Sequence, residues 1–283
     1  MKSKLLLAIV FIASLCTIYV LMSDAKTNST TLPTNTEQQN LIHTKLIYDK
    51  PIEGYTVTAD WQPFEAQNCE TGLITIYFHN IATGQEFQYE NREKFSSYHT
   101  DLITFADGFE GYKDGDVFTI EYVTNPDNIY SDSPIDYYLP FQFFDVDFDG
   151  IKELLINDDS KAQQGNHYTV FEITDSGLVE KAYPPFDDVD NAMVFDCEAN
   201  IISRYFRDGC YFHMIVHYQK IDKMSVQRIS IPLRLEERLK STLSELSEDK
   251  PSDFHIISAE INMGDDEYVF EVKDNRWSLI EDK

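Results

Sequence analysis

The stretch FFDVDFDGIKELLIND, from Phe143 to Asp158, carries three aspartates at alternate positions, Asp145, Asp147 and Asp149. A glycine follows them, and Glu153 stands four positions after the last aspartate. Aromatic and branched apolar residues, which favour strands, flank these carboxylates on both sides. Carboxylates so close together repel one another, and a bound cation would offset that repulsion. The stretch therefore predicts two strands joined by a loop that binds a cation.

The spacing of this loop is that of a calcium site. The pattern D-x-D-x-D-G puts the aspartates at positions one, three and five and Gly150 at position six, where a sharp turn needs a positive φ. Position twelve, where an EF-hand supplies a bidentate glutamate, is Ile156, so the loop is not an EF-hand. Closely spaced carboxylates favour Ca²⁺ over Mg²⁺ as the bound ion. They also favour a calcium site over a solvated acidic turn. The predicted ligands are the side chains of Asp145, Asp147, Asp149 and Glu153 and the carbonyl of Ile151.

Strand signals recur along the chain from about residue 44 onward, as short runs of alternating, β-branched and aromatic residues between turn residues. Four segments share the order of aromatic strand, polar turn and second strand, namely 73–90, 167–183, 213–231 and 267–281. Leucines at nearly helical spacing predict one helix. We therefore predict a mainly β fold of antiparallel hairpins, in an irregular β-propeller-like or sandwich arrangement, with one short helix near residues 232–246.

The composition allows a full apolar core and excludes some partners. The chain has 283 residues, of which 42% are hydrophobic, and its formal net charge is −26. A field of that sign repels nucleic acid and anionic lipid and attracts cations and basic proteins. Solubility alone is the plainer explanation of the charge. We expect no nucleic-acid partner, and a basic protein is the partner that the charge favours.

The N-terminus indicates export. A short basic segment, MKSK, precedes the apolar run Leu5–Met22, and Ser23 and Ala25 stand where a signal peptidase would cleave. An uncleaved anchor formed by residues 5–22 is the alternative, and lipidation at Cys16 is a third. Either way the body of the protein would lie in the periplasm or the cell envelope, touching the membrane only through this segment. The predicted parts are a signal peptide or anchor (1–25), a flexible linker (26–40), an N-terminal β region (41–125) and a calcium-loop β region with the covering helix and a C-terminal hairpin (126–283).

Exported proteins lie in an oxidising environment, so the cysteines of this chain are candidates for disulfides. Cys197 and Cys210 bracket EANIISRYFRDG, which is typical of two strands around a turn. We predict a disulfide between them that closes a hairpin, with Cys69 left over. A pairing that includes Cys69 stays open.

The acidic stretch also carries a resemblance. The segment YLPFQFFDVDFDGIKELLIND is similar to the calcium loop of integrin-α/FG-GAP-type β-propeller repeats, as used in single copy by small exported bacterial proteins. After it come NHYTVFEITDSGLVEKA and MVFDCEANIISRYFRDGCYFHMIVHYQK, in an order similar to that of one proteobacterial family of periplasmic propeller-like proteins. The resemblance covers about residues 138–222, has one such loop and lacks an FG-GAP tetrapeptide. It implies calcium at Asp145, Asp147, Asp149 and Glu153. Because a member of that family is a lysozyme inhibitor linked to protection against antibacterial effectors, it also implies a lysozyme-type target.

Two acidic loops are candidates for contact with such a partner. The first contains Asp187, Asp188 and Asp190 behind two prolines, and the second mixes acids and glycines with Phe109 and Tyr112. Aromatic rings supply contact area in protein recognition and charge speeds the encounter, although solvated turns are the plainer reading of both loops.

The chain lacks a zincin helix motif, a nucleophile elbow, a phosphate-binding loop and a dinucleotide fingerprint. We therefore predict no catalytic residues and a binding protein rather than an enzyme. The leading hypothesis is an exported calcium-binding protein that inhibits a basic cell-wall hydrolase, as inhibitor or immunity protein. The alternative is a calcium-stabilised surface module for adhesion or glycan binding, and an uncharacterised hydrolase is a third class.

Overall fold

The computed structural model describes residues 42–65, 72–95, 111–122, 134–136, 139–157, 167–190, 192–208, 212–232, 235–247, 251–264 and 266–282. These residues belong to one compact unit, Leu41–Lys283. The predicted leader (1–25) and linker (26–40) lie outside the described residues. Within the described part of the chain, no helix is long and apolar enough to cross a membrane.

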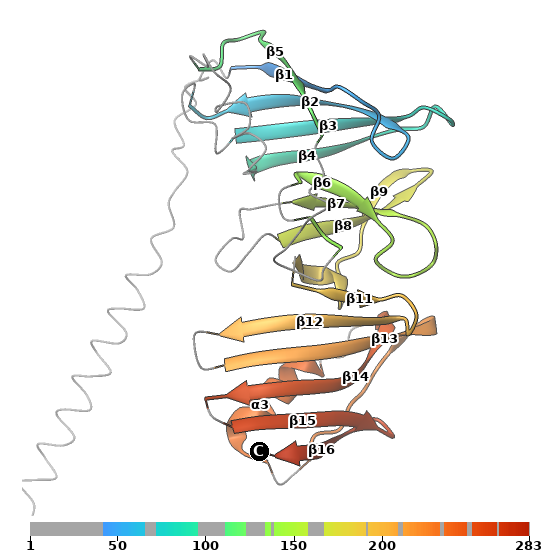
Figure 1. The fold of residues 1–283 in the computed structure, drawn as a ribbon, viewed down its shortest axis with the longest axis vertical. Coiled ribbons are helices and arrows are strands. Elements are labelled where there is room, and N and C mark those ends of the chain that lie inside the picture. The colour runs from blue at the N-terminus through green and yellow to red at the C-terminus, as the bar shows by residue number, and fades with distance from the viewer. Residues whose placement is uncertain are drawn as a thin grey trace, which may run out of the picture. The chain divides into compact units, whose positions relative to one another are not determined.

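Strands dominate the described residues, and Figure 1 labels them along the chain. Their bounds are β1 (Thr44–Tyr48), β2 (Tyr55–Pro63), β3 (Gly72–Asn80), β4 (Glu86–Phe95), β5 (Val117–Ile120), β6 (Phe141–Phe144), β7 (Glu153–Asn157), β8 (His167–Thr174), β9 (Gly177–Glu180), β10 (Val189–Asp190), β11 (Val194–Asp196), β12 (Ile201–Asp208), β13 (Phe212–Val226), β14 (Pro251–Met263), β15 (Asp266–Lys273) and β16 (Arg276–Asp282). The helical elements are the 3-10 turn η2 (Phe186–Asp188) and the helix α3 (Glu237–Leu246).

The strands form three sheets. The first has the order β4-β3-β2-β1-β5, and its β1–β5 pair is parallel while the others are antiparallel. The second has the order β10-β8-β7-β6, with β9 paired to β8, and the third runs from β11 to β16 in sequence order. Both of these sheets are antiparallel throughout.

Two apolar cores hold the sheets together, and the β6–β7 hairpin belongs to both. Phe141 and Phe143 of β6 and Leu154 and Ile156 of β7 pack with the first sheet. Leu155, between those two β7 residues, packs instead with side chains of the third sheet and α3. Since successive residues of a strand point to opposite faces, β7 is buried along its whole length. The loop that joins β6 to β7 is therefore attached to the most buried hairpin of the second sheet.

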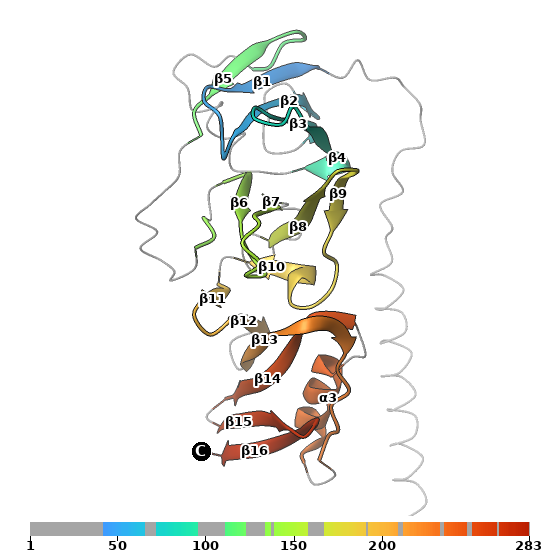
Figure 2. The same ribbon diagram turned by 90° about the vertical axis from the view of Figure 1, so that its right-hand side faces the viewer.

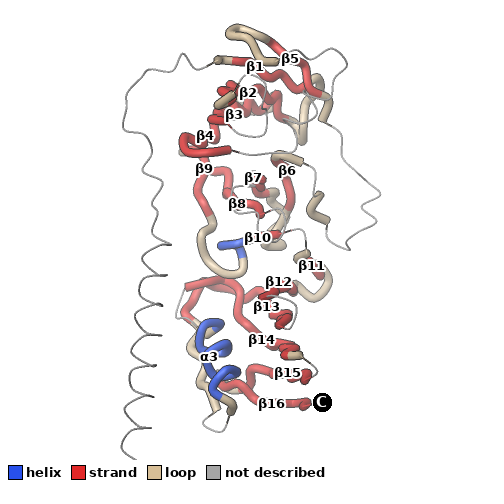
Figure 3. Tube along the Cα trace, turned by 90° about the vertical axis from the view of Figure 1, so that its left-hand side faces the viewer, coloured by secondary structure: helices blue, strands red, loops and turns tan. Residues whose placement is uncertain are grey.

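The helix α3 covers one face of the third sheet (Figures 2 and 3). Leu239 and Leu243 are its buried residues, and they join the same core as Phe270 and Trp277. The Trp277 indole N–H donates a hydrogen bond to the Ser247 hydroxyl, 3.0 Å away, at the end of the helix. The sequence placed this helix at 232–246, and the structure begins it later, at Glu237.

The predicted mainly β fold of antiparallel hairpins with one short helix is confirmed, in a sandwich-like arrangement. Three of the four predicted hairpin segments are hairpins, formed by β3–β4, β8–β9 and β15–β16. The prediction for 213–231 is wrong, because one long strand, β13, occupies most of that segment. The predicted division near residue 125 separates the first sheet from the second in the sequence, but one core includes residues from both sides of it, such as Ile120 and Phe141.

Candidate metal site in the β6–β7 loop

The acidic loop, residues 145–152, connects β6 to β7. The two strands pair in antiparallel register, with Phe144 opposite Glu153. Gly150 has a φ of +87°, as the sequence predicted for the sixth position of the loop. Phe148 also has a positive φ, of 60°, and its ring lies against Phe195 and Phe254 with centroid distances of 6.4 and 6.1 Å. An aromatic contact with the third sheet therefore fixes the middle of the loop, which the spacing of the aspartates did not predict.

The three aspartates converge. One ligand oxygen from each of Asp145, Asp147 and Asp149 lies within 4.8 Å of the others. Asp147 is buried, Asp145 is half-buried and Asp149 is exposed. The structure thus brings these three predicted ligands together, and side-chain oxygens that close can share one cation.

Backbone amides within the loop hold the carboxylates in place. The N–H groups of Asp149 and Gly150 donate to the two oxygens of Asp145, at 3.1 and 2.9 Å. The N–H of Ile151 donates to Asp149 Oδ1 at 2.7 Å. These bonds orient the oxygens but supply only part of the positive charge that the cluster needs.

Two lysines from outside the loop supply more of that charge. The Lys181 ammonium, which follows β9, donates to Asp147 Oδ2 and, at 2.8 Å, to Glu153 Oε1. The Lys220 ammonium, from β13, donates to the Asp147 carbonyl and lies 3.5 Å from Asp147 Oδ1. Neither lysine had a sequence signal, because each is distant from the loop along the chain.

The predicted fourth side-chain ligand does not join the aspartates. Glu153 is 2% exposed, and Lys181 binds one of its oxygens while the Val146 N–H, at 3.1 Å, binds the other. The buried Glu153 carboxylate is therefore neutralised by Lys181 and does not point into the group of aspartates. The structure therefore brings three of the four predicted side-chain ligands together and places Glu153 behind them.

Burial and charge shift the pKa values of this buried pair. Burial by itself lowers the pKa of Lys181, but the hydrogen bonds and charges of Asp147 and Glu153 outweigh it and hold that pKa above its ordinary value. Burial raises the pKa of Glu153, and the Lys181 ammonium offsets this only in part. Lys181 is thus a permanent cation at neutral pH.

The described residues fit a calcium ion at the outer side of the loop. When ionised, the four carboxylates carry four negative charges and the two ammonium groups two positive ones, which leaves a charge of minus two. Calcium takes six to eight oxygen ligands, and waters supply those that a protein does not. The side chain of Ile151 is 65% exposed, so the seventh loop position is at the surface. The residues that would hold the ion are Asp145, Asp147 and Asp149.

The two loops predicted to contact a partner do not form protruding contact surfaces where the structure describes them. Tyr112 is 2% exposed and its ring lies 5.6 Å from that of Phe118, so its prediction as a contact residue is wrong. The Asp187 carboxylate pairs at 2.8 Å with the buried Arg204, and Asp190 Oδ1 accepts the Ala192 N–H at 2.8 Å. That loop is a turn tied into the fold by Phe186 and Val189 rather than an anionic protrusion. Phe109 and the side chain of Asp188 lie outside the described residues.

The predicted Cys197–Cys210 disulfide is also wrong. Residues 201–208 form one strand, β12, instead of two strands around a turn. Cys197 is a free, exposed cysteine, and Cys69 and Cys210 lie outside the described residues.

Comparisons with known proteins show no family for this chain. No family model matches the chain, and no curated protein does. A solved structure described as "Structure of a Xanthomonas Type IV Secretion System related protein" aligns with 87% of this chain and 96% of its own, at 12% identity and a TM-score of 0.48. A likeness at that level assigns no activity to this chain.

Proposed function

We propose that this protein is an exported calcium-binding module that captures a basic cell-wall hydrolase of the lysozyme type and blocks its active-site cleft. The observation that carries the proposal is the convergence of Asp145, Asp147 and Asp149 within 4.8 Å on a loop with excess negative charge. The net charge of −26 supports a basic partner, because a field of that size accelerates encounter with positive surfaces. The sequence resemblance supplies the class of target.

The position of the acidic loop supports a role as a fixed recognition element. Phe148 attaches it to the third sheet, Lys181 to the second, and the Lys152–Glu53 ion pair, at 2.9 Å, to the first. A bound calcium would neutralise the charge that the two lysines leave. Binding sites held by rigid elements lose less conformational entropy when a partner docks. The loop would then present exposed Asp149 and Ile151 in one conformation.

A lysis assay tests the proposal. The chain beginning at Lys26 retains the whole Leu41–Lys283 unit. This chain, in calcium buffer at physiological salt, should slow the clearing of a peptidoglycan suspension by at least one basic lysozyme in a dose-dependent way. Asp149→Asn should weaken inhibition, while Asp175→Asn, which removes an exposed charge from the β8–β9 turn, should not.

A negative result in this assay would contradict the proposal. If lysozymes of several types clear the suspension at unchanged rates, the hydrolase proposal fails. Retention of the same chain on polysaccharide would then favour the adhesion or glycan-binding alternative.

A further inference from the structure

Two cations contact the acidic loop, and they bind different oxygens of Asp147. The Lys181 ammonium binds Asp147 Oδ2 and Glu153 Oε1, and the Lys181 side chain is 7% exposed. The Lys220 ammonium binds the Asp147 carbonyl and lies 3.5 Å from Asp147 Oδ1, and the Lys220 side chain is 24% exposed. Lys181 is therefore a buried cation between two carboxylates, whereas Lys220 reaches the loop from the third sheet and remains in contact with solvent.

The oxygen beside Lys220 is the one that faces the other aspartates. The Asp149 N–H donates to Asp147 Oδ1 at 3.2 Å and to Asp145 Oδ1 at 3.1 Å. Two oxygens that accept from the same N–H lie next to each other, so Asp147 Oδ1 belongs to the group of oxygens that would bind calcium. The other oxygen, Oδ2, is the one that Lys181 holds together with Glu153, behind the aspartates.

A calcium ion bound by the aspartates would therefore lie close to Lys220. Calcium binds carboxylate oxygens at about 2.3–2.6 Å. Because Lys220 Nζ lies 3.5 Å from Asp147 Oδ1, an ion on that oxygen would lie within about 6 Å of the ammonium. At that separation, even the dielectric constant of water leaves a repulsion between the ion and the ammonium that weakens calcium binding about tenfold. The lower effective dielectric constant near a protein surface makes this repulsion larger.

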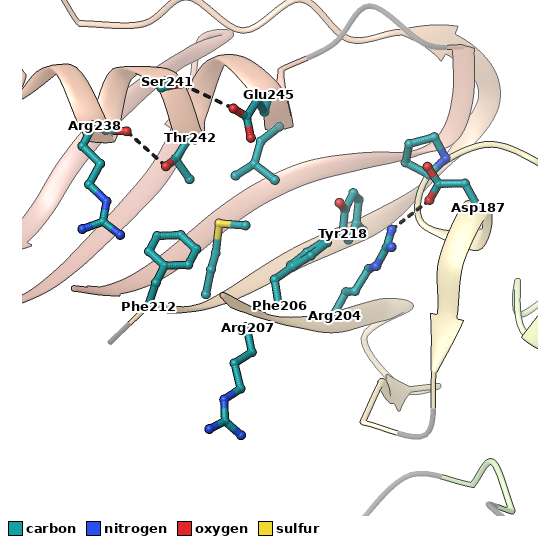
Figure 4. A pocket seen from close by; sticks show the side chains of 13 residues that line it. Asp187, Arg204, Phe206, Arg207, Phe212, Tyr218, Arg238, Ser241, Thr242 and Glu245 are labelled. Atoms are coloured by element: carbon teal, nitrogen blue, oxygen red, sulfur yellow. Dashed lines mark hydrogen bonds and ion pairs between the residues drawn. The ribbon is translucent and has the colours of Figure 1, made fainter. Parts of the chain in front are cut away.

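The neighbouring strand β12 carries a second buried cation, Arg204, which binds elsewhere. Its guanidinium lies 2.8 Å from the Asp187 carboxylate (Figure 4) and 4.5 Å, at Cζ, from the centroid of the Phe206 ring. Arg204 is 6% exposed, so burial fixes its position as well as this ion pair. Lys220 differs from it, because its side chain is partly exposed and the regular pairing of β13 with β14 is interrupted just after it. The Lys220 ammonium can therefore turn to solvent without breaking the ladder of the sheet.

We propose that Lys220 is a counter-ion that calcium displaces, and that it sets the calcium affinity of the acidic loop. Without calcium, the Lys220 ammonium offsets part of the charge of the aspartates. When calcium binds, the flexible side chain of Lys220 turns to solvent, while Lys181 keeps its contacts with Asp147 and Glu153. This inference rests on the calcium site of the proposed function, and it adds that a cation of the protein itself weakens that site.

Calorimetric titration of calcium into the chelator-treated chain beginning at Lys26, at low ionic strength, tests the proposal. Lys220→Gln should bind calcium at least tenfold more tightly than the parent, because the repulsion is removed. Lys220→Arg keeps the charge and should bind no more tightly than the parent. Lys223→Gln is the matched control for net charge, since Lys223 is an exposed lysine of the same strand, and it should bind as the parent does.

A second measurement separates this role from a purely structural one. Without calcium, Lys220→Gln should unfold at a lower urea concentration than the parent, because the aspartates lose a counter-ion. The same substitution should thus destabilise the calcium-free chain and strengthen calcium binding, whereas a loss of packing alone would weaken both. If the variant is partly unfolded in the chelator, its urea unfolding over a series of calcium concentrations yields the dissociation constant.

Two results would overturn the inference, and they are distinguishable. Calcium binding by the parent that Lys220→Gln leaves unchanged or weakens would remove the role of Lys220 and leave the calcium site in place. A parent chain that binds no calcium would overturn the inference and the calcium site together.

Discussion

At the scale of single residues, Lys181 offsets much of the negative charge of the acidic loop. Its side chain is 7% exposed, and it neutralises Asp147 and Glu153, which are 7% and 3% exposed at their side chains. Removing one partner of a buried pair leaves the others as uncompensated charges, which costs more than the pair itself contributes.

Lys181→Met should therefore lower the free energy of unfolding by about 3–5 kcal/mol, measured by urea denaturation at neutral pH. Lys152→Met is the matched control, since the Lys152–Glu53 pair is about half exposed and should contribute less than about 1 kcal/mol. Equal stabilities for the two variants would contradict the assignment of Lys181 as an internal cation.

The same pair has a defined dependence on pH. The folded-state pKa of Lys181 lies above its ordinary value, so its contribution is complete below the unfolded pKa of about 10.4 and is lost as the pH rises through the folded pKa. The stability difference between the parent and Lys181→Met should stay constant from neutral pH to about pH 10 and shrink above it.

At the scale of elements, the acidic loop depends on its backbone as much as on its charges. Gly150 has a φ of +87°, and a Cβ placed there would meet nothing within 4 Å. A substitution at this position is therefore opposed by backbone strain and by no steric clash.

Gly150→Ala should lower the stability of the chain by about 1–2 kcal/mol, the cost of a left-handed residue with a Cβ. Gly150→Asn should cost less, because asparagine tolerates that conformation better. Urea denaturation of both variants without calcium measures the difference. If alanine is as stable as glycine here, the loop does not have the tight turn described.

The elements also show what could be predicted from the sequence. Alternation along β2 and β3 and the D-x-D-x-D-G spacing are local signals, and they gave the strands, the hairpins and the three converging aspartates. Lys181 and Lys220 could not be predicted, because their partner Asp147 is 34 and 73 residues away. The disulfide prediction failed for a local reason, since residues 201–208 form the single strand β12 where the sequence predicted two strands around a turn.

At the scale of the whole unit, the acidic loop joins the two strands of a hairpin that contributes to both apolar cores. Phe143 and Leu154 bury one side of the β6–β7 hairpin with the first sheet, and Leu155 buries the other side with the third. A cation that stabilises the loop would therefore stabilise the entire unit and raise its unfolding temperature, rather than ordering one turn alone.

One buried and one half-buried tyrosine give the whole unit a sensitivity to alkali. Burial raises the pKa of Tyr183 and of Tyr218 to about 12, while tyrosines in the unfolded chain ionise at about 10. Because the unfolded state ionises first, stability should fall as the pH rises from about 10 to about 12. The near-ultraviolet absorbance of tyrosinate, followed together with circular dichroism, should show late ionisation that coincides with unfolding. Full ionisation at the ordinary pKa in a folded chain would contradict this account.

The measurement that tests the central claim most directly is the thermal unfolding of the chelator-treated chain with and without calcium. At a calcium concentration one hundred times the dissociation constant, binding to the folded state alone adds about 2.7 kcal/mol, enough to raise the melting temperature by several degrees. The account predicts this rise for the parent and for Asp175→Asn, and its loss in Asp145→Asn with Asp149→Asn. A parent chain that melts at the same temperature with and without calcium would contradict it.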